Sequence, residues 1–322
     1  MNGRVLVVGS FNVDHAWTSS SLPRAGETLA GRYASGAGGK GFNQATAAAR
    51  AGASTAFVCA LGEDAGGRMA RELAEDDGIE LLAQPADAPT GTAGIFVDGE
   101  GRNCIVLGPG ANAGLSADHV QSVQAEIAAS RVVLAQLEVP ASAVETALRL
   151  ARDANVATLL NPAPANAEVP EALLSLADVL TPNETEFASL VARHVGERVD
   201  PDEVAILDQA RLHALCRELL PHGSVVVTLG TAGCFVSHPY DALRGDDSVH
   251  YRAPSERVDT IDTTGAGDAF NGALAASLAL DADASFASHV QLATRFAALS
   301  TEHAGAASSM PRRNDVSARF SA

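Results

Sequence analysis

The sequence is poor in lysine, in aromatic residues and in cysteine, and it carries no long hydrophobic run. Lys40 is the single lysine among the 22 basic residues of this 322-residue chain, and the net charge is −17. A chain with this charge lacks the basic face that nucleic acids and anionic membranes require for phosphate contacts. We therefore expect neither as a partner, and the charge of an anionic ligand must be neutralised locally.

The same shortages bear on location. No apolar stretch approaches the roughly 20 residues that span a bilayer, and the N-terminus enters a strand pattern without the features of a signal peptide. The cysteines, Cys59, Cys104, Cys216 and Cys234, are scattered without C-x-x-C spacing, which favours reduced thiols over disulfides or a zinc site. We expect a cytoplasmic protein.

Short β-branched runs alternate with stretches of helical periodicity along most of the chain. This alternation is typical of βαβ units and predicts an α/β fold with a doubly wound, mainly parallel sheet flanked by helices. Ligands of such folds bind beyond the carboxyl ends of the strands. The polar segment 240–250 is predicted to be a solvated loop. The predicted strands are 4–10, 55–62, 132–138, 156–162, 178–184 and 224–230, and the predicted helices are 66–77, 116–129, 140–154 and 203–220.

Two segments interrupt this alternation and predict a small β-sheet lid. Residues 13–35 follow the first strand without a helical pattern, and residues 92–108 are typical of a hairpin. Both leave the core beside polar residues, as expected of an element that closes over a site and excludes water. A β lid exposes apolar surface and strand edges, which predicts a homodimer through the lid. The remaining ranges, 1–12, 36–91 and 109–322, are assigned to the core.

The segment 261–280 places glycines at the start of a long Ala/Leu helix, with Asp268 in its first turn. Backbone N–H groups converge in Gly265, Ala266 and Gly267, and the helix dipole adds to them, so the segment can form an anion hole for a phosphoryl group. In isolation these residues would more often form a tight turn in which Asp268 complements the dipole. The wider sequence favours the first interpretation.

Segments at both ends of the chain resemble the ribokinase-like, or PfkB, carbohydrate kinases. DTTGAGDAFNGAL resembles the C-terminal motif of that family, and SGAGGKGFNQATAAARAG (35–52) resembles its glycine-rich sugar-binding segment. Between them, TPNETE (181–186) matches the N-x-x-E motif and TLGTAG (228–233) matches the nucleotide-binding strand and loop. The resemblance covers essentially the whole chain. It implies ATP-dependent phosphorylation of the primary hydroxyl of a sugar, with D-ribose favoured.

Polar residues follow the predicted strands where such a sugar would bind. Asn12 and Asp14 follow the first strand, Glu138 ends the QLE strand, and Asn43 lies one turn into the helix after the glycine-rich segment. Each has a structural alternative as a turn former, a cap or a surface carboxylate. As a set they match S-x-N-x-D, G-G-K-G-x-N and Q-L-E of the family. The resemblance implies that the sugar is held by Asn12, Asp14, Gly39, Lys40, Asn43 and Glu138.

The resemblance also implies the catalytic and nucleotide-binding residues. Asp268 would accept the proton of the sugar hydroxyl, and Gly265, Ala266 and Gly267 would form the anion hole. Glu186 would hold Mg²⁺ through water, although a first-turn helix carboxylate is its alternative. Asn183, Thr228, Gly230 and Gly233 would bind ATP, and an activating K⁺ would lie among Asp262, Thr264, Ser300, His303, Gly305 and Ser309.

Three alternatives to a ribose kinase are open. Gly36, Gly38 and Gly41 satisfy the G-x-G-x-x-G pattern of dinucleotide-binding folds, but here the pattern does not directly follow the first strand. A fructokinase or nucleoside kinase of the same family would use the same motifs. A non-catalytic sugar-binding regulatory protein would keep the fold without turnover, and the presence of Asp268 and of both N-x-x-E residues argues against it.

Overall fold

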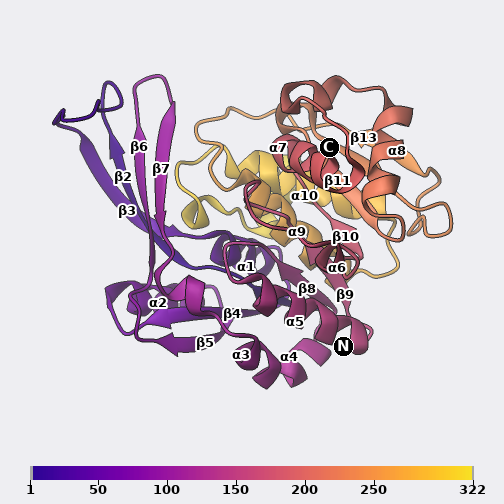
Figure 1. The fold of residues 1–322 in the computed structure, drawn as a ribbon, viewed down its shortest axis with the longest axis horizontal. Coiled ribbons are helices and arrows are strands. Elements are labelled where there is room, and N and C mark those ends of the chain that lie inside the picture. The colour runs from indigo at the N-terminus through magenta and orange to yellow at the C-terminus, as the bar shows by residue number, and fades with distance from the viewer. Residues whose placement is uncertain (1–2, 321–322) are drawn as a thin grey trace.

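A nine-stranded sheet runs through the centre of the computed structural model, which describes residues 3–320 (Figure 1). All six predicted strands form, and the doubly wound, mainly parallel sheet is confirmed. Three further strands, β5, β12 and β13, were not predicted. In sequence order the strands are β1 Arg4–Val8, β4 Ser54–Gly62, β5 Glu80–Ala86, β8 Val132–Ala135, β9 Ala157–Leu160, β10 Val179–Leu180, β11 Ser224–Thr228, β12 Cys234–Ser237 and β13 His250–Ala253.

The order of the strands puts a switch point beside β1. The sheet reads β13-β12-β11-β10-β9-β8-β1-β4-β5, and only the β11–β12 and β12–β13 pairs are antiparallel. After β1 the chain builds the sheet first through β4 and β5 and later, on the other side, from β8 onward. The segments that follow β1 and β8 therefore leave the carboxyl edge side by side, which is where ligands of such sheets bind.

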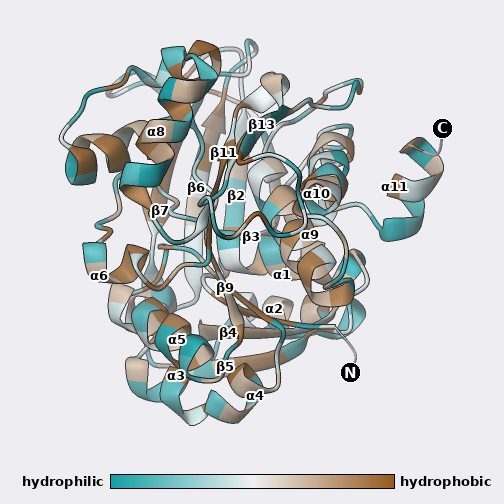
Figure 2. Ribbon diagram, turned by 90° about the vertical axis from the view of Figure 1, so that its right-hand side faces the viewer, coloured by the Kyte–Doolittle hydropathy of each residue, from teal (hydrophilic) through white to brown (hydrophobic). Residues whose placement is uncertain are grey.

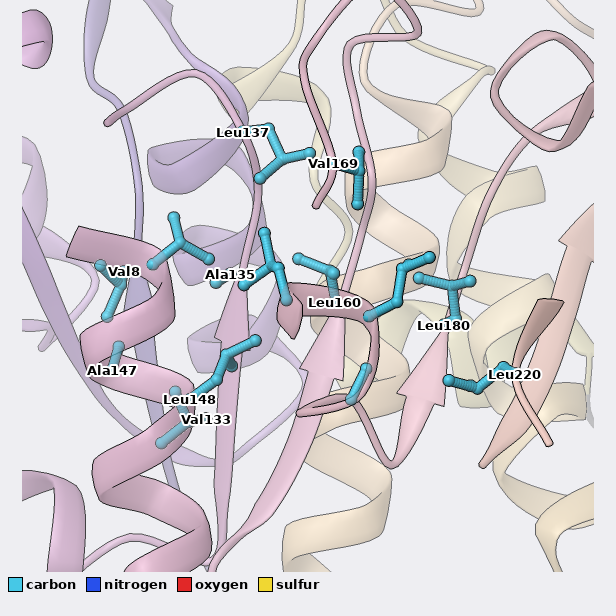
Figure 3. Packing of buried hydrophobic residues seen from close by; sticks show 14 of the residues in the cluster. Val8, Val133, Ala135, Leu137, Ala147, Leu148, Leu160, Val169, Leu180 and Leu220 are labelled. Carbon is cyan, nitrogen blue, oxygen red and sulfur yellow. The ribbon is translucent and has the colours of Figure 1, made fainter. Parts of the chain in front are cut away.

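Helices cover both faces of the sheet because alternate strand residues point to opposite sides. Leu6 and Val8 of β1 pack toward α3 to α8, whereas Val5 and Val7 pack toward α1, α2, α9, α10 and α11. Figure 3 shows the first of these cores, with Val8 and neighbouring strand residues against α5. Figure 2 shows hydrophobic strands between helices whose outer turns are hydrophilic. The helices are α1 Lys40–Arg50, α2 Ala65–Asp76, α3 Ala117–Ser122, α4 Gln124–Ala128, α5 Ala141–Asp153, α6 Glu171–Leu174, α7 Glu184–Leu190, α8 Gln209–Leu219, α9 Ala266–Leu280, α10 Phe286–Ser300 and α11 Arg313–Phe320.

Two of the four predicted helices are shorter than expected. The helix predicted over 116–129 is divided at Val123, which has ψ 22° and separates α3 from α4. The helix predicted over 203–220 is α8 alone. A separate 3₁₀ turn, Pro201–Ile206, precedes it, and the Asp208 carboxylate starts α8 by accepting from two backbone N–H groups of its first turn. Within residues 3–320, no helix has the length and apolarity needed to cross a membrane.

A second sheet stands apart from the core, as the upright indigo and purple strands in Figure 1 show. Its order is β3-β2-β6-β7, with a parallel pair, β2 and β6, at the centre and an antiparallel neighbour on each side. The predicted small β sheet is confirmed. Its strands are β2 Asn12–Thr18, β3 Arg32–Gly38, β6 Gly91–Val97 and β7 Asn103–Gly108.

Candidate active site

Asp268 lies buried in the first turn of α9, at the carboxyl edge of the large sheet. Gly265 precedes the helix with φ +78°, a conformation that residues with a Cβ rarely adopt. Gly267 faces open space, because no atom lies within 4 Å of the position that a Cβ would take there. The first turn of a helix has N–H groups without intrahelical acceptors. This helix start therefore presents donors and a carboxylate at one place.

Helix α1 holds this carboxylate through two neighbouring amides. The two helices approach so closely at Gly272 that a Cβ there would collide with the backbone of α1. Asn43 Nδ2 donates to Asp268 Oδ2 at 2.8 Å, and Gln44 Nε2 donates to Asp268 Oδ1 at 2.9 Å. Both oxygens of the carboxylate are thereby fixed in direction.

Asn43 also offers an unused acceptor. Its Oδ1 is buried and accepts no hydrogen bond from residues 3–320. A buried acceptor without a donor costs free energy, so such an atom beside a carboxylate indicates a ligand that supplies the donor. A sugar hydroxyl is a donor of this kind.

Glu138, after β8, is tied to the segment after β1. Its Oε2 accepts from Ser10 Oγ at 2.6 Å and from the backbone N–H of Lys40 at 3.0 Å. This contact requires Gly39, with φ +86°, because a Cβ there would lie 2.8 Å from the backbone nitrogen of Asn12. The glycine-rich segment thus brings α1, β1 and β8 together at the switch point.

Asn12 and Asp14 lie on β2, where the small sheet joins the core. Asn112 Nδ2 donates to Asn12 Oδ1 at 2.8 Å and so fixes that amide. Asp14 lies over Gly38 of the adjacent strand, where a Cβ would collide with its carboxylate. Leu107 of the small sheet lines a cavity of about 360 Å³ together with Asn12 and residues near Glu138. The small sheet therefore contributes to the same opening as the core.

Two carboxyls of this site, those of Asp14 and Asp268, have raised pKa values. Burial, assisted by the charges of Glu138 and Asp268, raises the pKa of Asp14 to about 6. Burial also raises the pKa of Asp268, although Lys40 and the two amide donors oppose the shift. Elevated carboxyl pKa values in a cavity are typical of binding and proton-transfer sites.

Lys40 lies between these carboxyls and the next group of residues. Burial disfavours its charge, but Asp268, Glu138 and Glu186 together raise the pKa of its ammonium group. The single lysine of this acidic chain therefore carries a positive charge that interacts with three acidic residues of the site.

Asn183 and Glu186 start α7 with a reciprocal cap. Glu186 N donates to Asn183 Oδ1 at 2.8 Å, and Asn183 N donates to Glu186 Oε2 at 2.9 Å. The structural alternative for Glu186, a carboxylate in the first turn of a helix, is therefore what the structure shows. Its carboxyl is nevertheless buried and close enough to Lys40 for their charges to interact, and burial raises its pKa. Capping and ligand binding remain compatible, because the cap uses one carboxylate oxygen.

The other expected nucleotide residues lie beside this cap. Thr228 ends β11 and donates its backbone N–H to the carbonyl of Pro182 at 2.9 Å, which places it next to Asn183. Gly230 and Gly233 follow with φ +51° and +86°, and a Cβ on Gly233 would collide with the backbone after β13. This part of the site is shaped by backbone rather than by side chains.

The expected cation residues form two adjoining loops. Asp262 Oδ1 accepts from Thr264 N and its Oδ2 accepts from Gly305 N, both at 2.9 Å. Burial opposes ionisation, but these hydrogen bonds hold the pKa of Asp262 below its usual range. Ser300 and Ser309 direct their hydroxyls to carbonyls of their own segments, and His303 is exposed. The loop before α9 is thereby tied to the loop after α10.

The dinucleotide alternative is excluded by the position of its glycines. Gly36 and Gly38 lie within β3 of the small sheet, and Gly41 lies in the first turn of α1. They do not form the turn between the first strand and first helix of a βαβ unit, which that fingerprint requires.

Sequence reasoning did not assign five polar residues that hold the site together. All are buried and bond to one another or to the predicted residues. Three were visible beside predicted residues, in the S-x-N-x-D, FNQ and QLE runs, but their role depends on side-chain direction. The residues are Ser10, Gln44, Asn112, Gln136 and Asn161.

Comparisons with known proteins identify the family of the chain. A model of the pfkB family carbohydrate kinases matches residues 2–313. The chain belongs to this family. This carbohydrate kinase is 37% identical over 317 residues to the ribokinase of Mus musculus, covering 97% of this chain and 93% of the mouse protein.

Solved structures give the same result for the fold of this carbohydrate kinase. The ribokinase of Giardia lamblia superposes with a TM-score of 0.86 and 27% identity, covering 98% of this chain and 99% of that one. The ribokinase of Arabidopsis thaliana, solved in complex with ribose and ATP, has a TM-score of 0.79 and 30% identity, covering 98% of both chains.

Proposed function

We propose that this carbohydrate kinase transfers the γ-phosphate of ATP to the primary hydroxyl of D-ribose and produces D-ribose 5-phosphate. The observation that carries the proposal is the buried Asp268 carboxylate, held at both oxygens and placed at the N-terminus of α9. The similarity to ribokinases, one of them solved with ribose and ATP, supports this pair of substrates.

In this mechanism Asp268 acts as the general base. It accepts the proton of the hydroxyl while that oxygen bonds to the γ-phosphorus, the bond from phosphorus to the bridging oxygen breaks, and ADP leaves. The N–H groups of Gly265, Ala266 and Gly267 stabilise the negative charge that develops on the phosphoryl group. The Ala266 N–H donates to the carbonyl of Thr263 at 3.2 Å, so it must turn toward the phosphate on binding.

The sugar would be fixed by acceptors on three sides. Asn43 Oδ1 lacks a donor, Glu138 is held by Ser10 and α1, and Asp14 reaches the site from the small sheet. Carboxylates and amides in a dry cleft discriminate strongly for hydroxyl groups, because an unmatched polar group is costly there. Lys40 adds the local positive charge that the phosphates of ATP need in an acidic protein.

The residues also fit Mg²⁺ bound through the nucleotide. Within residues 3–320 no three acidic, histidine or cysteine side chains gather as a metal cage. Mg²⁺ that accompanies phosphates keeps several waters and needs only one or two carboxylates. Glu186 is suited to this role, since its cap uses only Oε2. The ion would neutralise charge on the phosphates during transfer.

An activating K⁺ would lie at the Asp262 loops. Asp262 is ionised and joins the loop of Thr264 to that of Gly305. The carboxylate oxygens of Asp262 and the backbone carbonyls of the two loops are the kind of oxygen ligands that bind such a cation. The ion would order the loop that leads into the anion hole.

We also propose that residues 13–35 and 92–108 act as a closing lid and join two subunits. Asp14 belongs to the face of the small sheet toward the site, so alternation places Trp17, Tyr33 and Val106 on the opposite face. These three residues are 37%, 55% and 65% exposed in one chain. A second lid would cover this apolar face. Sedimentation should show a dimer at micromolar concentration, and a monomer with and without sugar would contradict it.

The cytoplasm is the proposed location, because ATP is available there and free thiols persist there. Cys59, Cys216 and Cys234 are buried and unpaired in disulfides, which agrees with a reducing compartment.

A kinase assay across sugars tests the proposed function. The purified protein is given ATP, Mg²⁺ and, separately, ribose, 2-deoxyribose, fructose and nucleosides, with and without K⁺. We expect the highest kcat/KM with ribose. A preference for fructose or a nucleoside would correct the substrate. Sugar binding without any phosphate transfer would indicate the regulatory protein instead.

A further inference from the structure

Gln44 is a buried side chain that no step of the proposed mechanism uses, yet it contacts the catalytic carboxylate. Its Nε2 lies 2.9 Å from Asp268 Oδ1 and 3.0 Å from Asn161 Oδ1. Its Oε1 accepts a hydrogen bond from Nε2 of Gln136. Gln44 and Gln136 are each 0% exposed, so solvent does not compete for these hydrogen bonds.

The direction of this hydrogen-bond chain is set by a backbone carbonyl. The carbonyl oxygen of Thr181, just after β10, can only accept, and Asn161 Nδ2 donates to it at 2.9 Å. Asn161 therefore presents its Oδ1 to Gln44, and the Gln44 amino group donates to it. The same amino group also donates to Asp268. The backbone carbonyl of Thr181 thus fixes the orientation in which Gln44 is a donor to the carboxylate.

A donor at this place favours one protonation state of Asp268. Burial favours the neutral acid, which cannot accept a proton from a hydroxyl. Hydrogen bonds from amide N–H groups favour the carboxylate. Gln136, which donates to the far end of the Gln44 amide, strengthens the Gln44 donor by polarising it.

We propose that Gln44 is a positioning residue, which keeps Asp268 ionised and fixes its direction for proton transfer from the sugar. This inference rests on the proposed phosphoryl transfer. Asn43 performs a related task on the other oxygen, but its free Oδ1 also makes it a candidate sugar contact. Gln44 has no such second role in the described structure, because its Nε2 and Oε1 both have protein partners. Its effect should therefore separate from sugar binding.

The test compares Gln44→Leu and Gln44→Glu with the wild type across pH 5 to 9. Leu removes the donor, whereas Glu keeps the shape of Gln and places a second carboxyl beside Asp268. The acid limb of the kcat profile should move to higher pH by about one unit in Gln44→Leu, so that kcat is up to about tenfold lower on that limb and recovers at higher pH. It should move further in Gln44→Glu, because like charges oppose ionisation. KM for ribose should stay within about threefold in both.

The order of the two variants distinguishes positioning from packing. If Gln44 only fills space, Gln44→Glu keeps its shape and should perturb the enzyme less than Gln44→Leu. A larger shift of the acid limb in Gln44→Leu than in Gln44→Glu would therefore overturn the proposal. Thr146→Val, a buried hydroxyl of α5 that donates to the carbonyl of Ser142, is the control for loss of a buried hydrogen bond. It should keep the wild-type profile.

Two further outcomes are decisive. If the wild type phosphorylates no sugar, the proposed function is wrong. If the wild type is active but Gln44→Leu has the same pH profile, the proposed role of Gln44 is wrong and the proposed function stands. If thermal unfolding shows that Gln44→Leu does not fold, Gln136→Leu takes its place. That variant should move the acid limb in the same direction by a smaller amount, and an unmoved limb would refute the proposal.

Discussion

The sugar half and the nucleotide half of the site are built in different ways. In the sugar half, buried side chains from separate elements bond to one another, as Asn43 does to Asp268 and Ser10 does to Glu138. In the nucleotide half, glycines with positive φ and backbone groups set the shape. In the proposed mechanism, side-chain identity should therefore control sugar recognition and proton transfer, while backbone geometry should contribute more to the handling of phosphate. Substitutions should separate the two halves.

The largest effect is expected from Asp268→Asn. An amide cannot accept the proton, so kcat should fall by about two to four orders of magnitude. Sugar affinity should change by only several-fold, because the loss acts on the transition state. Steady-state kinetics and calorimetry with ribose measure the two quantities.

Thermal unfolding of the same variant serves as its control. Asn presents an amino group to one of the two donors, Asn43 or Gln44, so a small loss of stability is expected. A variant that keeps a tenth of wild-type activity would remove Asp268 from the role of base.

Two asparagines test whether the halves are separable. Asn43→Ala removes the free acceptor and should weaken ribose binding by about 1–3 kcal/mol, with ATP binding almost unchanged. It should also lower kcat, because Asn43 Nδ2 donates to Asp268. Asn183→Ala removes the N-cap of α7, so it should weaken ATP binding and lower the free energy of unfolding by about 1 kcal/mol.

Calorimetry with each ligand decides the outcome of this pair. Equal losses for ribose and ATP in either variant would show that the halves are coupled. They would also place that asparagine in the folding of the site rather than in binding.

The gathering of the expected sugar residues was more predictable from sequence than that of the expected nucleotide residues, for a physical reason. Asn12, Asp14 and Glu138 belong to the segments that follow β1 and β8, and Asn43 lies near a helix start. The carboxyl edge of the sheet brings these segments together. The sequence could not predict the direction in which each side chain points or which hydrogen bonds it makes. Gln44 differs from an ordinary helix glutamine only because a carbonyl at the sheet edge orients it.

The pH dependence of sugar binding sharpens the role of the small sheet. Burial raises the pKa of Asp14 from 3.8 to about 6, so its carboxylate is available to sugar hydroxyls only above that pH. Ribose affinity without nucleotide should fall by up to about tenfold per pH unit below 6. Asp14→Asn should remove this inflection, and an unchanged inflection would assign it to another group.

Folding stability should respond to Asp14 in the opposite direction. Its pKa is higher in the folded chain than the usual 3.8, so the folded state holds the extra proton between about pH 4 and 6. Its contribution to stability is therefore present at low pH and lost as the pH rises through 6. Chemical denaturation of the wild type and of Asp14→Asn at pH 4.5 and 7 measures this difference.

The fold was predictable where periodicity is strong and less so at the edges. Runs such as those of β1 and β11 are buried on both faces, whereas β13 is half-exposed and lacks such a pattern. The expectation that 240–250 is a solvated loop was wrong at Asp246. Its carboxylate accepts from Tyr251 Oη at 2.7 Å and from the backbone of Ala287 at 2.8 Å. A run of polar residues in a sequence shows which groups are charged, but it does not show which residues they contact in the fold.

The smallest effect is expected in the cation loops, where the contribution is indirect. Asp262 holds the loops of Thr264 and Gly305 together without reaching the phosphate, so Asp262→Ala should lower kcat several-fold and abolish its response to K⁺. Because the ordered loop leads to Gly265, the change should appear in kcat and leave KM for ribose unaltered. Asp247→Ala, at an exposed position of the same polar loop as Asp246, is the matched control and should keep the full response. If the wild type is equally active in potassium and in a buffer free of sodium and potassium, no activating cation binds at these loops. In that case the loop that leads into α9 would be ordered by the hydrogen bonds of Asp262 without a bound ion.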